Sequence, residues 1–296
     1  MPKLSSTAYS IRPAMDEDRQ KLANLMHFEL NVHRHLDWRS PIDWIGFQPF
    51  LLLETEGVLR GALACPEDPP WVAWVQFFAA SSGFESLPDT WQILWERTRL
   101  ELMRRQINHF AAIPLQSWFM ELIVSSHFEH THDVVVLSWD YSAARSRPQT
   151  PPLLIRPMQM EDLENVTDID SAAFRPIWRN SFESLQTALK QAAVATVVQD
   201  PSSREIIAYQ ISTSSPIGGH LARLAVHPLR QGQNIGYALV YDLIRQFERS
   251  GVFRITVNTQ HDNTASLKLY EKAGFRKTGE TFPVYESHSA GGILGG

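Results

Sequence analysis

The sequence predicts an α/β fold that is built twice along one chain of 296 residues. Three observations support this prediction. A short motif recurs at a fixed distance, a polar and proline-rich segment lies between its two copies, and strand-like runs alternate with helical patterns. Apolar residues make up 44% of the chain and charged residues 20%, as is usual for globular proteins. We therefore expect two α/β domains.

The recurring motif opens each half of the chain. Ile11-Arg12-Pro13 matches Ile155-Arg156-Pro157, and Glu17-Asp18 matches Glu161-Asp162, with the same offset of 144 residues (155 − 11 and 161 − 17). A shared offset in two short blocks indicates a repeat of domain size. Proline and polar residues between the copies are typical of a linker. The predicted organisation is a first domain at 1–141, a linker at 142–152, a second domain at 153–286 and a flexible tail at 287–296.

Each copy opens with a short strand, a proline, an acidic turn and a helix, because carboxylates are favourable at the positive end of a helix. In the second copy, strands are predicted at Leu153–Arg156, Ala193–Gln199, Glu205–Thr213, His220–Val226 and Arg254–Thr259. Helical periodicity predicts helices at Phe182–Ala192, Gly236–Ser250 and Thr264–Ala273. A final strand near Thr281–Glu286 is expected to form a hairpin with Phe275–Thr278.

Composition and charge exclude several classes of protein. The single cysteine, Cys65, excludes an intramolecular disulfide and suits a reducing compartment. No stretch approaches the ~18 apolar residues of a membrane span, and the first residues contain no long apolar run. The net charge is −5 and no lysine or arginine cluster occurs, which argues against nucleic acid as a partner. We expect a cytoplasmic protein that binds neither nucleic acid nor membranes.

A polar, glycine-bearing turn precedes the helix predicted at 236–250. Pro228 ends the strand before it, because proline has no backbone N–H for the ladder. A strand, a tight turn and a helix together direct several backbone N–H groups toward one point, where the helix dipole favours an anion. Glycine allows left-handed dihedrals and a close approach of a ligand. The turn therefore favours a phosphate cradle, with an ordinary capped helix as the alternative.

Together with its flanking segments, this turn resembles the GCN5-related N-acetyltransferase (GNAT) family. The resemblance rests on the strand LARLAVHP, on Gln231-x-x-Asn234-x-Gly236, and on Asn263-x-x-Ser266-x-x-x-Tyr270-x-x-x-Gly274-Phe275. It implies two tandem acyl-CoA N-acyltransferase-like domains, each a mixed and mainly antiparallel sheet flanked by helices. The family usually has glycine where this chain has Asn234, and asparagine tolerates left-handed dihedrals better than most residues.

The resemblance implies acetyl-coenzyme A (acetyl-CoA) as the cosubstrate. Backbone N–H groups of the turn would hold the pyrophosphate, and the backbone of the preceding strand would pair with the pantetheine arm like an added strand. The cofactor-binding residues that the resemblance implies are Leu224, Ala225, Val226, Gln231, Gly232, Gln233, Asn234, Ile235, Gly236, Tyr237, Asn263 and Ser266.

Two residues are candidates for the proton transfers. Tyr270 matches the family's tyrosine that protonates the leaving sulfur, and a core aromatic is its alternative role. An amine with a pKa of about 10 is mostly protonated at neutral pH, so a base must remove its proton. His220 lies six residues before Val226, where some family members have a glutamate; a turn histidine is its alternative role. Trp178 would line the acceptor pocket or pack at the surface.

The first half is expected to repeat the fold without the cradle. Acidic residues and a proline stand where its turn should be, and His127-Phe128 replaces Gly274-Phe275. Eight of the nine tryptophans lie in this half, where they could line a pocket or form a bulky core. No metal site is expected at His127, His130 and His132, because no cysteine accompanies them and Glu129 would point to the opposite face.

The sequence thus predicts an N-acetyltransferase whose second half transfers an acetyl group from acetyl-CoA to a primary amine by direct attack. The acceptor would be a small-molecule or peptide amine, and the protein a monomer or homodimer. One alternative is a non-catalytic acyl-CoA sensor or scaffold. A narrower one is an aminothiol acetyltransferase, because two such domains in about 300 residues also resemble mycothiol synthase. A protein N-terminal or ribosomal-protein acetyltransferase is a further narrow option.

Overall fold

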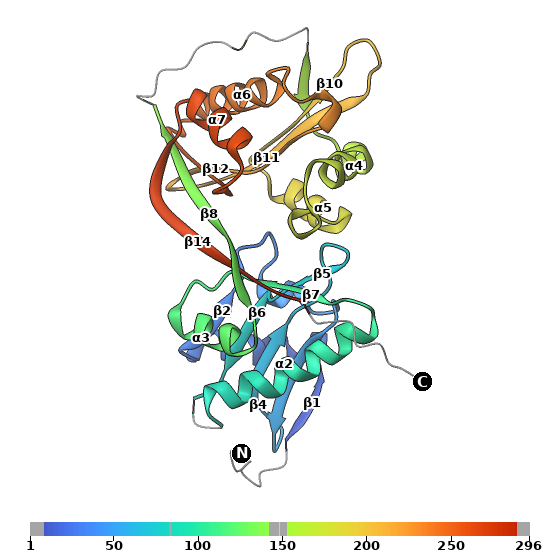
Figure 1. Ribbon diagram of the computed structural model, residues 1–296, viewed down its shortest axis with the longest axis vertical. Helices are drawn as coiled ribbons and strands as arrows, with labels where there is room; N and C mark the ends of the chain where they lie inside the picture. Colours follow the sequence, from blue (N-terminus) through green and yellow to red (C-terminus); the bar gives the residue numbers. More distant parts are fainter. Residues whose placement is uncertain (1–8, 83–84, 142–147, 149–152, 289–296) are drawn as a thin grey trace. The chain divides into compact units, whose positions relative to one another are not determined.

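The structure is a computed structural model that describes residues 9–82, 85–141, 148 and 153–288. The chain divides into two compact units (Figure 1). Unit 1 comprises Met1–Thr131 and Pro283–Gly296, and unit 2 comprises His132–Phe282. This division differs from the predicted domain boundaries, because two strands, β8 (Glu129–Asp140) and β14 (Arg276–His288), each continue from one unit into the other.

Unit 1 contains an antiparallel sheet with the strand order β1-β3-β4-β6-β2. A second set of strands, β5, β7 and the end of β14, contains one parallel and one antiparallel pair. The strands are β1 (Ser10–Pro13), β2 (Asn31–Arg34), β3 (Phe50–Thr55), β4 (Val58–Ala64), β5 (Val72–Trp74), β6 (Phe77–Ala80) and β7 (His109–Ala112). The helices are α1 (Arg19–Phe28), α2 (Leu87–Arg104) and α3 (Ser117–Ser125).

Unit 2 contains strands in the order β14-β8-β13-β12-β11-β10-β9. Its sheet is mixed, because β12 and β13 are parallel while β9–β10, β10–β11, β11–β12 and β8–β13 are antiparallel. The further strands are β9 (Leu154–Pro157), β10 (Val194–Gln199), β11 (Ile206–Ser215), β12 (Gly218–Val226) and β13 (Arg254–Gln260). The helices are α4 (Leu163–Ala173), α5 (Phe182–Gln191), α6 (Ile235–Arg249) and α7 (Thr264–Lys272), with a short 3-10 turn, η4 (Pro176–Trp178).

Helices cover both faces of the sheet in unit 2. Successive side chains of a strand point to opposite faces, so Ala208 and Tyr209 of β11 face different layers. Ala208 packs in one cluster with Ile235 and Leu239 of α6, whereas the Tyr209 hydroxyl binds Asp170 of α4. The predicted fold class, an α/β unit with a mainly antiparallel sheet between helices, is confirmed.

The repeat is present in the structure as well as in the sequence. Strand β9 and helix α4 lie 144 residues after β1 and α1, since 154 − 10 and 163 − 19 give the same offset. Both openings also make the same ion pair: Arg12 binds Asp18 and Arg156 binds Asp162, each with a shortest N–O distance of 2.7 Å. This pair joins the end of the first strand to the start of the first helix in each unit.

One element differs from the prediction. The segments expected to form a hairpin are a single strand, β14, and the residues predicted to start a flexible tail, Ser287 and His288, belong to it. Gly279 has a φ of +89°, yet the strand continues through it, because β14 lies next to β8 in unit 2 and its end, Tyr285–His288, pairs with β7 in unit 1. The predicted linker, apart from residue 148, and the tail from residue 289 lie outside the described residues.

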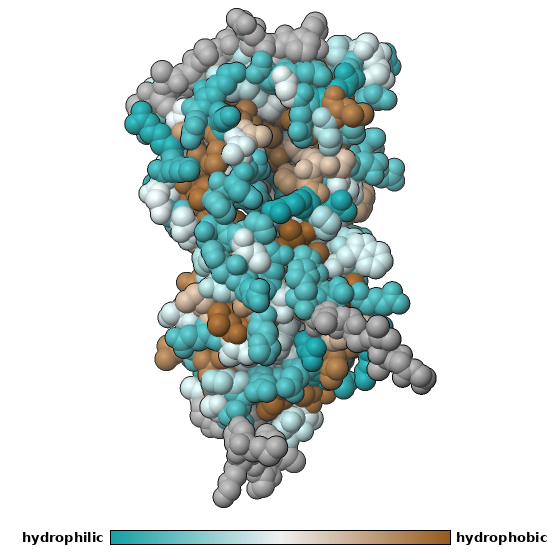
Figure 2. All heavy atoms as spheres, viewed as in Figure 1, coloured by the Kyte–Doolittle hydropathy of each residue, from teal (hydrophilic) through white to brown (hydrophobic). Residues whose placement is uncertain are grey.

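The tryptophans of the first half mainly pack in cores. Trp44, Trp91 and Trp139 are buried, the last of them in the core of unit 2. The face in view in Figure 2 is mostly hydrophilic, with smaller apolar patches between the polar side chains. None of the helices in the described part of the chain combines the length and the apolar character that a membrane span needs.

Candidate functional site

The glycine-bearing turn leads directly into α6. Asn234 is the N-cap residue and has left-handed dihedrals, with φ 60° and ψ 14°. Gly232 also has a positive φ, of 77°, and a Cβ atom added there would meet nothing within 4 Å. The first backbone N–H groups of an α-helix have no carbonyl partner within the helix. In α6 these groups begin at Ile235, beside the open space at Gly232.

Two side chains hold the turn in place. Gln231 donates a hydrogen bond from Nε2 to the carbonyl oxygen of Val226, at 3.1 Å. Lys272, at the end of α7, donates from Nζ to the Asn234 side-chain oxygen at 3.0 Å and lies 4.6 Å from the ring centre of Tyr237. Lys272 therefore adds a positive charge beside the start of α6, which favours an anion there in addition to the helix dipole.

Strand β12 parts from its neighbour on one side before it reaches the turn. It pairs with β13 only from Gly219 to Leu221, whereas it pairs with β11 as far as Val226. Within residues 153–288, all of which are described, no strand pairs with the segment 222–226 on the β13 side. This segment is therefore a sheet edge inside the domain, and an edge of this kind accepts an added extended chain.

The hydrogen bonds show which residues face the open edge. The His227 N–H donates to Ile207 of the neighbouring chain segment, at 2.9 Å, so the backbone of His227 faces β11. Backbone groups alternate between the two sides along an antiparallel strand. The backbone groups of Leu224 and Val226 therefore face the open edge, and those of Ala225 face β11.

Tyr270 lies on α7 and packs in the core next to Phe275, at a ring-centre distance of 5.7 Å. The side chain is 5% exposed, and burial raises the pKa of its hydroxyl above the ordinary value. A phenol with a raised pKa stays protonated at neutral pH, so it can donate a proton.

His220 lies on β12 where this strand still pairs with β13. Its Nδ1 lies 2.9 Å from the hydroxyl of Thr256, its cross-strand partner. Burial lowers the pKa of His220, so the imidazole is neutral at neutral pH and can accept a proton. The structure places it two residues before the segment of β12 that is open on the β13 side.

A buried ionic network, which the sequence analysis missed, lies beside the same strand. Asp170 of α4 is completely buried and accepts two hydrogen bonds from Arg223 of β12, at 2.7 and 2.8 Å. It also accepts a hydrogen bond from the Tyr209 hydroxyl. Burial, followed by the charge of Asp170, raises the pKa of Tyr209. The one available signal was a carboxylate on the apolar face of α4, next to Ile169.

Arg223 also positions the segment that contains Trp178. Its Nη2 donates to the carbonyl oxygen of Trp178 at 2.6 Å, and its guanidinium lies 3.6 Å from the ring centre of Phe174. Trp178 itself is half-buried in η4, and its ring lies 6.4 Å from that of His132. The network thus fixes the η4 loop against β12.

Asn263 and Ser266 have a structural contact of their own. The side-chain oxygen of Asn263 accepts a hydrogen bond from the Ser266 N–H, at 3.1 Å, and so caps the start of α7. The Asn263 side-chain nitrogen points to Gln260, at 3.4 Å. Asn263 therefore helps to position the helix that contains Tyr270.

The corresponding parts of unit 1 lack these features. Helix α3 lies 147 residues before α7 (264 − 117 and 272 − 125), and His127 has the positive φ of Gly274. The Phe128 N–H binds the Ile123 carbonyl just as the Phe275 N–H binds that of Tyr270. Isoleucine therefore stands where unit 2 has the tyrosine, so this position in unit 1 has no proton to donate.

The start of α2 in unit 1 is also unlike that of α6. Ser86 caps α2 by accepting a hydrogen bond from the Asp89 N–H at 3.3 Å. Pro88 removes one N–H group from the first turn, and the carboxylate of Asp89 adds a negative charge there. Both features oppose the binding of a phosphate group at this helix.

Comparisons with known proteins concern the family of the second half and the fold of the whole chain. Residues 163–275 match the sequence profile of the acetyltransferase (GNAT) family. A GCN5-related N-acetyltransferase from Sphaerobacter thermophilus is 14% identical with a TM-score of 0.59, covering 95% of both chains. A tandem GNAT protein from the clavulanic acid biosynthesis pathway is 13% identical with a TM-score of 0.64, covering 96% of this chain and 99% of its own.

A probable N-acyltransferase from Enterococcus faecalis V583 is 10% identical, with a TM-score of 0.70 over 95% of this chain and 72% of its own. At these identities the solved structures show the shared fold alone. No curated protein matches the sequence. Over nearly its whole length the chain shares its fold with these GNAT proteins, one of which is a tandem GNAT protein. The match to the GNAT family lies in the second half of the chain, so the acetyltransferase domain that it indicates is the one at residues 163–275.

Proposed function

We propose that unit 2 transfers an acetyl group from acetyl-CoA to a primary amine. The observation that carries this proposal is the open edge of β12, which ends at the turn before α6 and lies in the same unit as Tyr270. An extended pantetheine arm suits such an edge, because Leu224 offers a backbone donor and acceptor to it and Val226 offers its N–H. The same geometry would hold any acyl-CoA, and acetyl is the group that the family name indicates.

The turn would bind the pyrophosphate of the cosubstrate. Backbone N–H groups at the start of α6 and the positive charge of Lys272 both favour a phosphate group. Asn234 keeps the backbone in the left-handed conformation that glycine usually provides in this family. Most of these contacts are made by the main chain, so many side-chain changes in the turn should be tolerated.

The proton transfers are assigned to Tyr270 and His220. When the amine attacks the thioester carbonyl, the carbon–sulfur bond breaks and the electron pair stays on sulfur. Tyr270 would donate its hydroxyl proton to this thiolate, and its raised pKa keeps that proton available. His220, neutral at physiological pH, would accept the amine proton directly or through water. Asp170 is a poor candidate base, because Arg223 and Tyr209 already occupy its oxygens.

The acceptor would enter beside η4, where Arg223 holds the Trp178 carbonyl. The test compares Tyr270→Phe with the parent in a screen of amines against acetyl-CoA, read by release of free thiol. We expect the variant to lose about 100-fold or more in kcat while its affinity for coenzyme A, measured by calorimetry, stays the same. Tyr241→Phe on α6 is the matched control.

Two outcomes would contradict the proposal. If Tyr270→Phe keeps its full rate, Tyr270 is not the acid. If the parent binds coenzyme A but releases no thiol with any amine of a broad panel, unit 2 binds acyl-CoA without catalysis, which is the sensor function considered above.

A further inference from the structure

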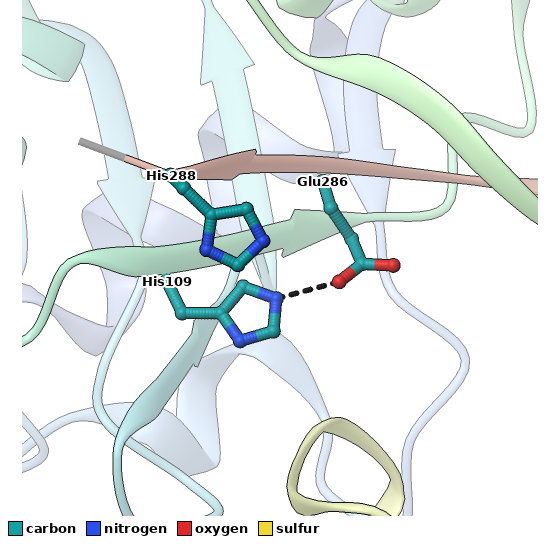
Figure 3. A group of neighbouring side chains, drawn as sticks. All are labelled: His109, Glu286 and His288. Atoms are coloured by element: carbon teal, nitrogen blue, oxygen red, sulfur yellow. Dashed lines mark hydrogen bonds and ion pairs between the residues drawn. The ribbon is translucent and has the colours of Figure 1, made fainter. Parts of the chain in front are cut away.

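Unit 1 brings two histidines and a glutamate together, away from the site described above. His109 lies on β7, and Glu286 and His288 lie on β14 (Figure 3). One potential ligand atom from each side chain lies within 4.8 Å of the other two. His109 lies 177 residues before Glu286, so no local motif in the sequence reveals the group.

The strand register is what places these side chains together. His288 is the direct cross-strand partner of His109, and Glu286 is the partner of Ala111. Direct partners in an antiparallel pair share one face, and so do residues two positions apart on one strand. All three side chains must therefore emerge on the same face of the β7–β14 pair, as Figure 3 shows.

The carboxylate of the group is already oriented. Glu286 is 8% exposed, and one of its oxygens lies 2.6 Å from Nε2 of His109. Its other oxygen accepts a hydrogen bond from the Thr131 hydroxyl at 2.5 Å. A hydrogen bond that fixes a carboxylate from behind is a common feature of metal ligands.

The two imidazoles stack on each other, with ring centres 4.2 Å apart and an angle of 27° between the planes. Ligand atoms around a tetrahedral zinc ion lie about 3.3 to 3.5 Å apart, given bond lengths of roughly 2.0 to 2.1 Å. To bind such an ion, the distance between His109 Nε2 and the Glu286 oxygen would have to increase by less than about 1 Å. The exposed ring of His288 can rotate to bring a nitrogen to the ion.

We propose that His109, Glu286 and His288 bind a divalent transition-metal ion of the Zn²⁺ type. Two imidazoles and one carboxylate suit Zn²⁺ and its neighbours, and not the all-oxygen sites that Ca²⁺ and Mg²⁺ prefer. Three protein ligands leave one position for water. The ion would link the end of β14 to β7, so its binding stabilises the strand pairing of unit 1.

The test uses the full chain without a histidine tag, after removal of metals with a chelator. Zn²⁺ is titrated by calorimetry, and Co²⁺ is titrated by its visible absorption, which reports tetrahedral coordination. We expect one ion per chain and a higher melting temperature of unit 1 with Zn²⁺. His288→Ala and Glu286→Gln should each weaken binding by about 10-fold or more.

His27→Ala, an exposed histidine of α1 outside the group, is the matched control and should bind as the parent does. His288 is exposed, so its replacement should leave the fold intact, which far-UV circular dichroism checks. The proposal is overturned if Zn²⁺ shows no saturable binding at micromolar concentration, or if His288→Ala and Glu286→Gln bind it as tightly as the parent. In either case the group is a histidine–glutamate hydrogen bond only.

Discussion

Asn234 holds a backbone conformation that most residues avoid, at the point where α6 begins. A left-handed conformation costs an ordinary L-residue about 1 to 2 kcal/mol, whereas glycine adopts it without this cost. For asparagine, the cost of this conformation lies between that of glycine and that of an ordinary L-residue. The left-handed conformation expected at this residue is confirmed, because the tolerance of asparagine for it is a local property of the residue type.

This reasoning predicts the order of stability of two variants. Asn234→Ala should have a free energy of unfolding about 1 kcal/mol below that of Asn234→Gly, because alanine pays the full cost of the positive φ. Urea denaturation of the full chain measures both. Both variants lose the hydrogen bond to Lys272, so this loss cancels in the comparison. Equal stabilities of the alanine and glycine variants would show that Asn234 is not strained.

The imidazole of His33, in unit 1, is buried in a way that disfavours its protonated form. It is completely buried, its ring stacks on Phe119 at 3.7 Å between centres, and its Nε2 lies 3.3 Å from the Val75 carbonyl. Burial, together with the neighbouring His35, lowers the pKa of His33 from 6.5 to about 3. Between these two values the unfolded chain binds one proton that the folded chain does not.

The stability of unit 1 should consequently fall as the pH falls from 6.5 toward 3. One such group contributes a slope of about 1.4 kcal/mol per pH unit. His33→Gln cannot titrate but keeps a donor for the Val75 carbonyl, so its unfolding free energy should depend less on pH by this amount. Tryptophan fluorescence, which Trp91 and Trp95 provide in unit 1, follows the transition. Identical pH slopes for the parent and the variant would mean that His33 is protonated in the folded state.

At the scale of elements, each strand and helix for which the sequence predicted bounds between residues 153 and 273 is present, with ends that differ by one or two residues. Their patterns are local: α6, for example, shows an apolar side that the helical period reveals. The end of the chain could not be predicted in this way. Gly279 and Pro283 suggest a turn, but whether a strand continues through them depends on partners such as β7, more than 170 residues earlier.

The same limit explains why the ionic network was missed. Asp170, Tyr209 and Arg223 belong to α4, β11 and β12, and only the packing of these three elements brings them together. The residue pattern also does not show that the edge of β12 is open, because the divergence of β12 and β13 after Leu221 depends on the whole sheet. The family resemblance supplied the functional role of Leu224 and Val226, and their orientation came from the hydrogen bonds.

The network should be an important source of stability in unit 2. Asp170→Asn leaves the buried guanidinium of Arg223 without its countercharge, so the free energy of unfolding should fall by about 3 to 5 kcal/mol. Asp200→Asn, which removes the charge that pairs with the partly exposed Arg230, should have a much smaller effect. Urea denaturation compares the two. If both variants lose the same free energy of unfolding, the burial of the Asp170–Arg223 pair does not make it more stabilising than the Asp200–Arg230 pair.

At the scale of the whole molecule, the two repeats do not coincide with the two units. Strand β8 follows α3 in the first half, yet most of it pairs with β13 in unit 2. Strand β14 ends the second half, yet its last residues pair with β7 in unit 1. Each unit therefore needs a strand segment from the other half of the chain, which a division at the linker would remove.

This exchange predicts which fragment folds. A fragment of residues 153–286 follows the repeat but lacks β8, so the core of unit 2 loses Leu137 and Trp139, both completely buried. The loss of the tryptophan alone costs about 3 to 5 kcal/mol, which is a large part of the stability of an ordinary domain. A fragment of residues 132–282 contains all of unit 2, including the parts of β8 and β14 that belong to it, and should fold.

Circular dichroism and calorimetric titration with coenzyme A compare the two fragments. We expect 132–282 to unfold cooperatively and to bind coenzyme A as the full chain does, because the turn, the open edge of β12 and Tyr270 all lie within it. We expect 153–286 to be insoluble or unfolded. Cooperative unfolding of 153–286 would show that the sheet closes without β8, and the strand exchange would then contribute nothing to the stability of the unit.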